Sequence, residues 1–255
     1  MVSCDRRPMD NHSRGTRTEH TGLAPDAIAG EATFTGCLST VDISRRVLVS
    51  TLPPSVALPQ SDSTQYPCLL VFGEQMDGKT FFGGLSVPWG IRYHELMVAV
   101  PFVRWEGAAG DHLFVSGMTC DFWPAVWNGN FYYGFKKRLA RMSWSGERFS
   151  VTDERDRRGF EAVLRARGET PGRALDRIRA AAALSVLGQR RDGVFVRSRF
   201  DWDFREATIE TASLRLTLGR FPEVPLGAHS ACHDDAYRIR RMLWRLSWPT
   251  PATAP

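Results

Sequence analysis

The sequence predicts an α+β fold that is mainly antiparallel β, barrel- or sandwich-like, with a few flanking helices. Short apolar or alternating runs bounded by glycine and proline recur along the chain, and such runs are typical of strands. The clearest are residues 32–37, 68–72, 93–102 and 111–117, and alternation returns at 195–204 and 207–218. Few segments have the length and period of a helix, and many strands with few helices favour a closed or layered sheet.

Four segments predict helices from their caps and their apolar spacing. They are residues 42–48, stopped by Pro53; 121–129, ending near Gly129 or Gly134; 172–187, rich in alanine; and 233–246. Asp42 and Asp121 are the expected N-caps of the first two, and Gly188 is expected to close the third. Two alternating segments, 148–151 and 160–164, flank a charged stretch and predict a hairpin.

One domain is expected for a chain of 255 residues, which can bury a single substantial core. Residues 1–28 are polar and without periodicity, so we expect a disordered or loosely attached arm there. The domain is expected over 29–248, and 249–255 form a proline-containing tail.

Several classes of protein are disfavoured by the composition. No apolar run approaches the roughly 18 residues of a membrane span, and the N-terminus has no apolar signal segment. These features predict a cytoplasmic protein without a membrane partner. The formal net charge of +5 invites a nucleic-acid hypothesis, but the arginines are scattered beside acids and no nucleic-acid-binding signature accompanies them, so no nucleic acid is expected.

Neither a metal nor a cofactor is expected. The five cysteines are scattered and form no CxxC pair, which argues against a zinc ribbon or a disulfide framework. The group His229, Cys232, His233, Asp234 and Asp235 matches no strong ligand spacing. Capping of a helix start by Asp234 is the simpler interpretation.

Lysine is rare in this chain. Lys79, Lys136 and Lys137 are the only lysines among 33 basic residues, yet two of them are adjacent. Arginine supplies charge and hydrogen bonds but cannot deprotonate to become an amine nucleophile. The lysine pair is therefore a candidate for amine chemistry. The alternative is a solvated surface patch formed with Arg138, which is the usual fate of such a triplet.

The run Gly129–Ala140, with the segment Tyr93-His94-Glu95 and Ala99-Val100-Pro101 upstream, resembles the acetoacetate decarboxylase-like superfamily. The resemblance implies that family's mainly antiparallel fold, a homo-oligomer, and a lysine that forms a Schiff base with a carbonyl substrate. Aligning on Leu139-Ala140 implies that Lys137 is the nucleophile, with Arg138 in place of a second lysine that lowers its pKa. Lys136 then stands where the family usually has proline, and which of the two lysines attacks stays open.

Elementary chemistry requires such tuning of Lys137. A free lysine has a pKa of about 10.4, so very little of it is a neutral amine at pH 7. Burial and a neighbouring cation both lower the pKa. If residues 135–139 are extended, Phe135, Lys137 and Leu139 share one face of the strand. That face would be apolar, as desolvation of the amine requires.

Glu95 is the candidate acid or base of the site, or a residue that positions substrate. The alternative is an ion pair between Glu95 and Arg92 or Arg104. His94 points to the opposite side of the strand from Glu95 and is expected to be structural.

Aromatic residues near the lysine pair are candidates for substrate binding. They are Tyr93, Trp127, Phe131 and Tyr133. The family's Gly-Arg-Glu sequence is Gly129-Asn130-Phe131 in this chain, so two charges are lost. Aromatic walls without those charges suit a larger and less polar carbonyl compound than a small keto acid.

The sequence thus predicts a Schiff-base-forming carbon–carbon lyase that acts on a keto acid or related carbonyl compound. Decarboxylation, aldol, dehydration and cyclisation chemistry all stay open. The alternative keeps the fold and has the pocket bind or cyclise a hydrophobic carbonyl compound without a covalent bond to Lys137.

Overall fold

The computed structural model describes residues 23–24, 27–82, 85–88, 90, 92–152, 159–168, 174–218 and 231–252. In these ranges the helices are α1 (Arg45–Thr51), α2 (Trp123–Phe131) and α3 (Ala174–Ala182). The strands are β1 (Ile28–Ser44), β2 (Val56–Ala57), β3 (Gln65–Phe82), β4 (Leu85–Pro88), β5 (Tyr93–Trp105), β6 (Ala108–Cys120), β7 (Lys137–Leu139), β8 (Arg141–Ser145), β9 (Arg148–Thr152), β10 (Phe160–Ala166), β11 (Ser185–Gln189), β12 (Phe195–Asp203), β13 (Thr208–Leu218), β14 (Ala231–Ser247) and β15 (Thr250–Pro251).

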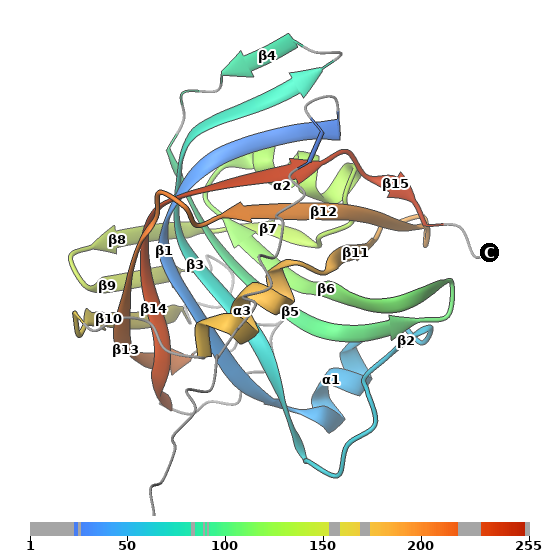
Figure 1. Cartoon of the computed structure of the whole chain (residues 1–255), viewed down its shortest axis with the longest axis horizontal. Coiled ribbons are helices and arrows are strands. Elements are labelled where there is room, and N and C mark those ends of the chain that lie inside the picture. Colours follow the sequence, from blue (N-terminus) through green and yellow to red (C-terminus); the bar gives the residue numbers. More distant parts are fainter. Residues whose placement is uncertain are drawn as a thin grey trace, which may run out of the picture.

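These strands form one sheet, part of which closes into a barrel (Figure 1). The sheet order is β15-β12-β11-β6-β5-β3-β1-β14-β13-β10-β9-β8, and an additional pairing of β12 with β14 closes it. In that pairing Phe200 lies opposite Leu246 and Asp203 opposite Leu243. The barrel comprises β1, β3, β5, β6, β11, β12 and β14. We call the extension formed by β13, β10, β9 and β8 the side sheet.

The pairing is antiparallel throughout the barrel and side sheet except where β6 meets β7 and β11 in parallel. This confirms the predicted α+β class, with a mainly antiparallel sheet and few helices. The predicted hairpin is also present, because β9 and β10 pair antiparallel with Phe160 opposite Val151.

Two apolar clusters fill the molecule. The barrel interior holds Phe34, Leu38, Met97, Val115, Met118 and Phe135, and α3 adds Leu175 and Ile178 to it. The second cluster lies between the barrel wall and the side sheet, where Phe72 contacts Phe149 at 5.0 Å and Phe160 at 5.8 Å between ring centroids. Full burial of each such ring stabilises the fold by roughly 1.5–3 kcal/mol.

The helix predicted at 233–246 is wrong, because this segment belongs to strand β14. Along β14 the buried residues include Tyr237 and Ile239 before Arg241, and Met242 and Leu246 after it. A bulge separates the two sets. Phe34 and Gly36 of β1 are two positions apart, whereas the β14 residues opposite them, Met242 and Ile239, are three positions apart. Arg241, within the bulge, has a positive φ of 58°. The bulge changes the apolar spacing from two to three, which imitates helical periodicity.

The helix predicted at 172–187 is too long. α3 ends at Ala182, and Leu187 and Gly188 belong to strand β11. Gly188 does not cap a helix. A Cβ there would lie 1.9 Å from the Tyr133 carbonyl oxygen, so glycine is required because the chain after α2 runs directly over β11.

Both predicted aspartate caps are also wrong. Asp42 lies inside β1, and α1 starts after Ser44 without a side-chain cap. Asp121 accepts hydrogen bonds from the backbone N–H and from Nδ1 of His94, each at 2.7 Å, instead of capping α2. α2 starts after Phe122 with proline in its first turn, a position where the missing N–H costs nothing.

At the ends of the predicted domain the structure differs by a few residues. Ile28, assigned to the arm, is the first residue of β1, and the tail contributes β15, in which Thr250 pairs with Arg197. The group around His229 and Cys232 lies outside the residues whose side chains are described. In the rest of the described chain, no group of three or more His, Cys, Asp and Glu side chains is arranged to hold a metal ion.

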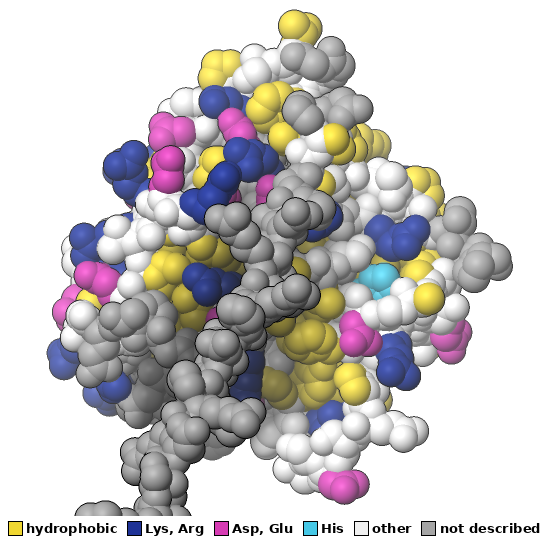
Figure 2. All heavy atoms as spheres, viewed as in Figure 1, with side chains coloured by type: hydrophobic (Ala, Val, Ile, Leu, Met, Phe, Trp, Pro, Cys, Tyr) yellow, Lys and Arg dark blue, Asp and Glu magenta, His cyan; other side chains and the backbone are white. Residues whose placement is uncertain are grey.

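Figure 2 shows one face of the molecule, on which acidic side chains are interspersed with Lys and Arg. No helix among the described residues is long and apolar enough to cross a membrane.

Candidate active site

Lys137 is fixed in place through its backbone by helix α2. The Asn130 side chain donates to the Lys137 carbonyl oxygen at 2.8 Å and accepts from the Lys137 N–H. Lys136 has a positive φ of 53°, so the chain turns sharply just before β7. As a result Phe135 and Lys137 face the barrel, whereas Leu139 is 55% exposed. The predicted apolar face therefore holds for Phe135 and Lys137 but is wrong for Leu139.

Gly129 leaves room for the Lys137 side chain. A Cβ at Gly129 would lie 2.6 Å from Cδ and 2.7 Å from Cε of Lys137. Glycine at this position is thus explained by the close approach of α2 to the lysine stem.

Replacing Gly129 with alanine is expected to displace the Lys137 amine while leaving the fold intact, because the contacted atoms belong to a flexible side chain. A misplacement of this size is expected to slow reactions of the Lys137 amine by roughly tenfold to a hundredfold. Borohydride trapping of a ketone on Lys137, followed by peptide mass spectrometry, measures the effect. Val126→Ala, on the same helix, is the control. An unchanged rate in Gly129→Ala would show that the lysine tolerates the displacement.

Glu95 pairs with Lys137 across the barrel wall. The Lys137 Nζ donates to Glu95 Oε1 at 2.6 Å, and both side chains are nearly buried, with 9% and 8% exposed. The alternatives for Glu95 do not hold, since Arg92 pairs with Glu74 and Arg104 with Asp111. Glu95 and Lys137 come together because β5, β6 and β7 are adjacent, with Cys120 opposite both Glu95 and Leu139.

The pKa of Lys137 is raised above its ordinary value, contrary to the expected lowering by Arg138. Burial lowers the Lys137 pKa. The charge of Glu95, the charge of Cys120 and the hydrogen bond to Glu95 together raise this pKa by more than burial lowers it. Burial in turn raises the pKa of the Cys120 thiol to about 11 and that of Tyr93 well above its usual range. Lys137 is therefore held as an ammonium ion whose proton lies on a short hydrogen bond to a carboxylate.

A hydrogen-bonded relay fixes the second oxygen of Glu95. Gln75 donates from Nε2 to Glu95 Oε2 at 3.3 Å, and the Trp244 indole N–H donates to Gln75 Oε1. An indole N–H only donates, so it determines which end of the Gln75 amide faces Glu95. The relay holds Glu95 with Oε1 directed at Lys137.

Trp244→Phe keeps a ring at this position but removes the donor to Gln75. We expect the Lys137 pKa to fall by about half a unit to one unit, because one hydrogen bond contributes about 1 kcal/mol and the freed amide holds the Glu95 carboxylate less well. Competitive acetylation of Lys137 across pH measures this shift. Trp144→Phe removes a remote indole that donates to Gly146 and should leave the midpoint unchanged. A raised or unaltered midpoint in Trp244→Phe would rule out the relay.

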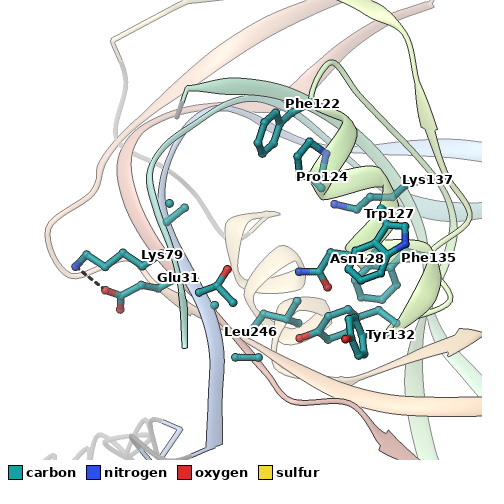
Figure 3. A pocket seen from close by; sticks show the side chains of 18 of the residues that line it. Glu31, Lys79, Phe122, Pro124, Trp127, Asn128, Tyr132, Phe135, Lys137 and Leu246 are labelled. Atoms are coloured by element: carbon teal, nitrogen blue, oxygen red, sulfur yellow. Dashed lines mark hydrogen bonds and ion pairs between the residues drawn. The ribbon is translucent and has the colours of Figure 1, made fainter. Parts of the chain in front are cut away.

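A cavity of about 610 Å³ opens beside Lys137. Its described wall is largely aromatic and aliphatic and includes Tyr93, Trp127, Tyr133, Phe135, Trp244 and Leu246. Figure 3 shows Lys137 on one side of the cavity near Trp127 and Phe135, with Asn128 and Tyr132 close by. Glu31 and Lys79 lie on the opposite side and pair with each other at 3.0 Å. A cavity of this size and lining suits a mostly apolar small molecule.

Three of the four predicted substrate-binding residues line this cavity: Tyr93, Trp127 and Tyr133. Phe131 does not. It is 55% exposed and stacks on Trp127 at 5.3 Å along the outer side of α2, where it borders a separate groove.

Neither neighbour of Lys137 lines the cavity. Lys136 is exposed, and its Nζ lies 5.8 Å from the centroid of the Phe114 ring. Arg138 is half-buried and points elsewhere. The geometry thus favours Lys137 over Lys136 as the reactive amine. His94 lies on the other side of β5 from Glu95, as predicted, and pairs there with Asp121.

Asn130, Gln75 and Trp244 were not predicted as site residues. In the sequence, Asn130 indicates only the loss of a charge relative to the family pattern. Its position seven residues before Lys137 nevertheless suits the two hydrogen bonds that it makes to the Lys137 backbone. Gln75 and Trp244 are 169 residues apart. No sequence pattern identifies them, because the pairing of β3 with β5 brings Gln75 beside Glu95, and Trp244 comes from β14, which pairs with β1 and β12.

Comparisons with known proteins agree with this architecture. No family model matches the chain, and no curated protein matches it in sequence. Among solved structures, acetoacetate decarboxylase from Legionella pneumophila is similar with a TM-score of 0.58 and 14% identity over 98% of both chains. The enduracididine biosynthesis enzyme MppR complexed with pyruvate has a TM-score of 0.59 and 16% identity over 92% of this chain and 94% of that one. An acetoacetate decarboxylase-like enzyme from Sphingomonas wittichii has a TM-score of 0.62 and 14% identity over 92% and 98%.

Proposed function

We propose that this chain, which has the fold of acetoacetate decarboxylase-like enzymes, forms a Schiff base between Lys137 and a carbonyl substrate. The observation that carries the proposal is the Lys137–Glu95 pair, nearly buried and facing an apolar cavity of about 610 Å³. A lysine amine in such a position is the group that carbonyl chemistry requires.

Glu95 has the role of proton acceptor and donor in this mechanism. It takes a proton from the Lys137 ammonium along their 2.6 Å hydrogen bond, which leaves a neutral amine. The amine attacks the carbonyl carbon, and a carbinolamine forms. Glu95 then returns the proton to the departing hydroxyl, which leaves as water, and a protonated iminium remains on Lys137. Because the Lys137 pKa is raised, this proton transfer is unfavourable, and the neutral amine forms only transiently before it attacks.

The iminium draws electrons from a neighbouring C–C or C–H bond, which supports lyase, aldol or dehydration chemistry. Among the described residues of the cavity wall, the charged ones are Glu31, Lys79 and Lys137. Lys79 is paired with Glu31, so apart from Lys137 the described wall has no unpaired cation for a substrate carboxylate. We therefore propose a larger, mostly apolar carbonyl compound in preference to a small β-keto acid.

Borohydride reduction in the presence of a ketone panel tests this proposal. Reduction of an iminium leaves a stable secondary amine, and peptide mass spectrometry then identifies the modified lysine. We expect the adduct on Lys137. Absence of an adduct with every ketone, or an adduct confined to Lys79 or Lys136, would contradict the proposal.

A second candidate function is noncovalent binding or cyclisation of a hydrophobic carbonyl compound, with Lys137 acting as a cation. The observation in its favour is the raised pKa of Lys137, which favours the ammonium form. Full activity of a Lys137→Arg variant would support this candidate.

A further inference from the structure

A second, smaller cavity of about 60 Å³ adjoins Lys137. Phe135, Lys137, Trp244 and Leu246 line both cavities, so the two meet at the lysine. Roughly 10–15 Å³ suffices for one water molecule. The smaller cavity therefore accommodates a few heavy atoms, such as a methyl or ethyl group, and excludes an aromatic ring. We call it the small chamber.

The small chamber and the large cavity differ in their polar groups. Glu95 and Gln75 line the small chamber but not the large cavity, and apart from Lys137 the rest of its described wall is apolar, including Met97 and Met118. Tyr93 and Asn128 line only the large cavity. The carboxylate paired with Lys137 thus faces a space that holds only a small alkyl group.

A ketone carbon joined to Lys137 is trigonal, and its two substituents point away from each other. With cavities of about 610 and 60 Å³ meeting at Lys137, the larger substituent enters one and the smaller enters the other. The smaller substituent's first carbon is bonded to the iminium carbon, and Glu95 Oε1 lies 2.6 Å from the nitrogen.

We propose that the substrate is an unsymmetrical ketone with a methyl or ethyl group in the small chamber and a large apolar group in the main cavity, and that Glu95 removes a proton from the small group. The step breaks the C–H bond of that α-carbon. Its electrons form the enamine C=C bond, the iminium π electrons return to nitrogen, and the proton goes to Glu95. The inference rests on the Schiff base proposed above, and it assigns the nucleophilic carbon to the smaller side.

Size selection is tested with ketones that share a phenethyl group and carry methyl, ethyl or tert-butyl on the other side. Borohydride trapping on Lys137 is measured for each and divided by the rate of iminium formation with butylamine in solution, which removes intrinsic steric differences. We expect at least about tenfold less normalised trapping of the tert-butyl ketone than of the methyl ketone, equivalent to about 1.4 kcal/mol. Equal trapping of all three would overturn the size assignment while leaving the Schiff base intact. Trapping of none would overturn the Schiff base itself.

Regiochemistry is tested by hydrogen exchange of the methyl ketone in heavy water, followed by NMR. Both the methyl and the methylene beside its carbonyl carry exchangeable protons. We expect the protein to favour deuterium at the methyl group by at least about tenfold over the ratio that butylamine gives, because Glu95 faces the small chamber. Exchange in the butylamine ratio, or preferentially at the methylene, would overturn the proposal.

A variant that enlarges the small chamber provides a matched test. Met118 lines the small chamber and not the large cavity. We expect Met118→Ala to raise trapping of the tert-butyl ketone relative to the methyl ketone by about tenfold. Val87→Ala, in the wall of the large cavity alone, should leave that ratio unchanged. An unchanged ratio in a folded Met118→Ala variant would contradict the assignment. Should that variant not fold, the ketone series and the exchange ratio on the unmodified protein decide.

Discussion

Lys137→Arg is expected to reduce ketone-dependent borohydride incorporation to background, a loss of at least about a hundredfold. Arginine keeps the positive charge and its pairing with Glu95, but the guanidinium does not deprotonate and cannot form an iminium. The variant therefore separates the amine's chemistry from its charge. Incorporation is measured by mass spectrometry of the intact protein and of the peptide that contains position 137.

Lys136→Arg and Lys79→Arg are the matched controls for this substitution. Lys136 is exposed over the Phe114 ring, and Lys79 pairs with Glu31, so arginine replaces either without loss of charge. Both variants should retain incorporation. Catalysis at the original level in Lys137→Arg would contradict the covalent mechanism and favour the noncovalent candidate.

Glu95→Gln is expected to reverse the pH dependence of the free energy of unfolding at alkaline pH. In the native protein the Lys137 pKa is raised, so the stability that the pair contributes is present below the ordinary lysine pKa and is lost as pH rises through the raised value. Without the carboxylate, burial remains and lowers the Lys137 pKa. Stability of the variant should then increase with pH between that lowered pKa and about 10.4, the value in the unfolded chain.

Near pH 7 the Glu95→Gln variant should be less stable by about 3–5 kcal/mol, the usual cost of leaving one charge of a buried pair without its partner. Urea denaturation across pH measures both effects. Glu161→Gln is the control, because Glu161 is half-buried and pairs at 2.8 Å with the exposed Arg148, and pairs near the surface contribute about 0–1 kcal/mol. A loss of stability in Glu95→Gln no larger than in this control would mean that the pair is not a buried ion pair.

Local patterns were sufficient for the fold class. The scarcity of lysine indicated Lys137 as a candidate, and the family resemblance indicated Glu95; the structure brings the two side chains within 2.6 Å of each other. The helix predicted in the last third of the chain was wrong because the bulge at Arg241 changes the apolar spacing of β14. Gly188 resembled the end of a helix, but glycine is needed there because the backbone at Tyr133 passes too close for a Cβ. A local pattern cannot distinguish these cases, since the reason lies in the neighbouring strand.

The electrostatics of Lys137 required the three-dimensional structure. The sequence places Arg138 beside Lys137 and therefore predicts repulsion, but alternation along β7 directs the two side chains to different sides. The pKa of Lys137 follows from burial and from Glu95, which lies 42 residues away. Gln75 reaches the site because β3 pairs with β5, and Trp244 lies on β14, which closes the barrel by pairing with β12.

The most direct test of the central claim is exchange of the carbonyl oxygen of benzylacetone with heavy-oxygen water. Each formation and hydrolysis of an iminium replaces the carbonyl oxygen with one from solvent, so no reductant or further reaction is needed. We predict that the protein accelerates this exchange and that Lys137→Arg abolishes the acceleration. Exchange no faster than in buffer, for a protein shown to bind the ketone, would contradict a Schiff base at Lys137.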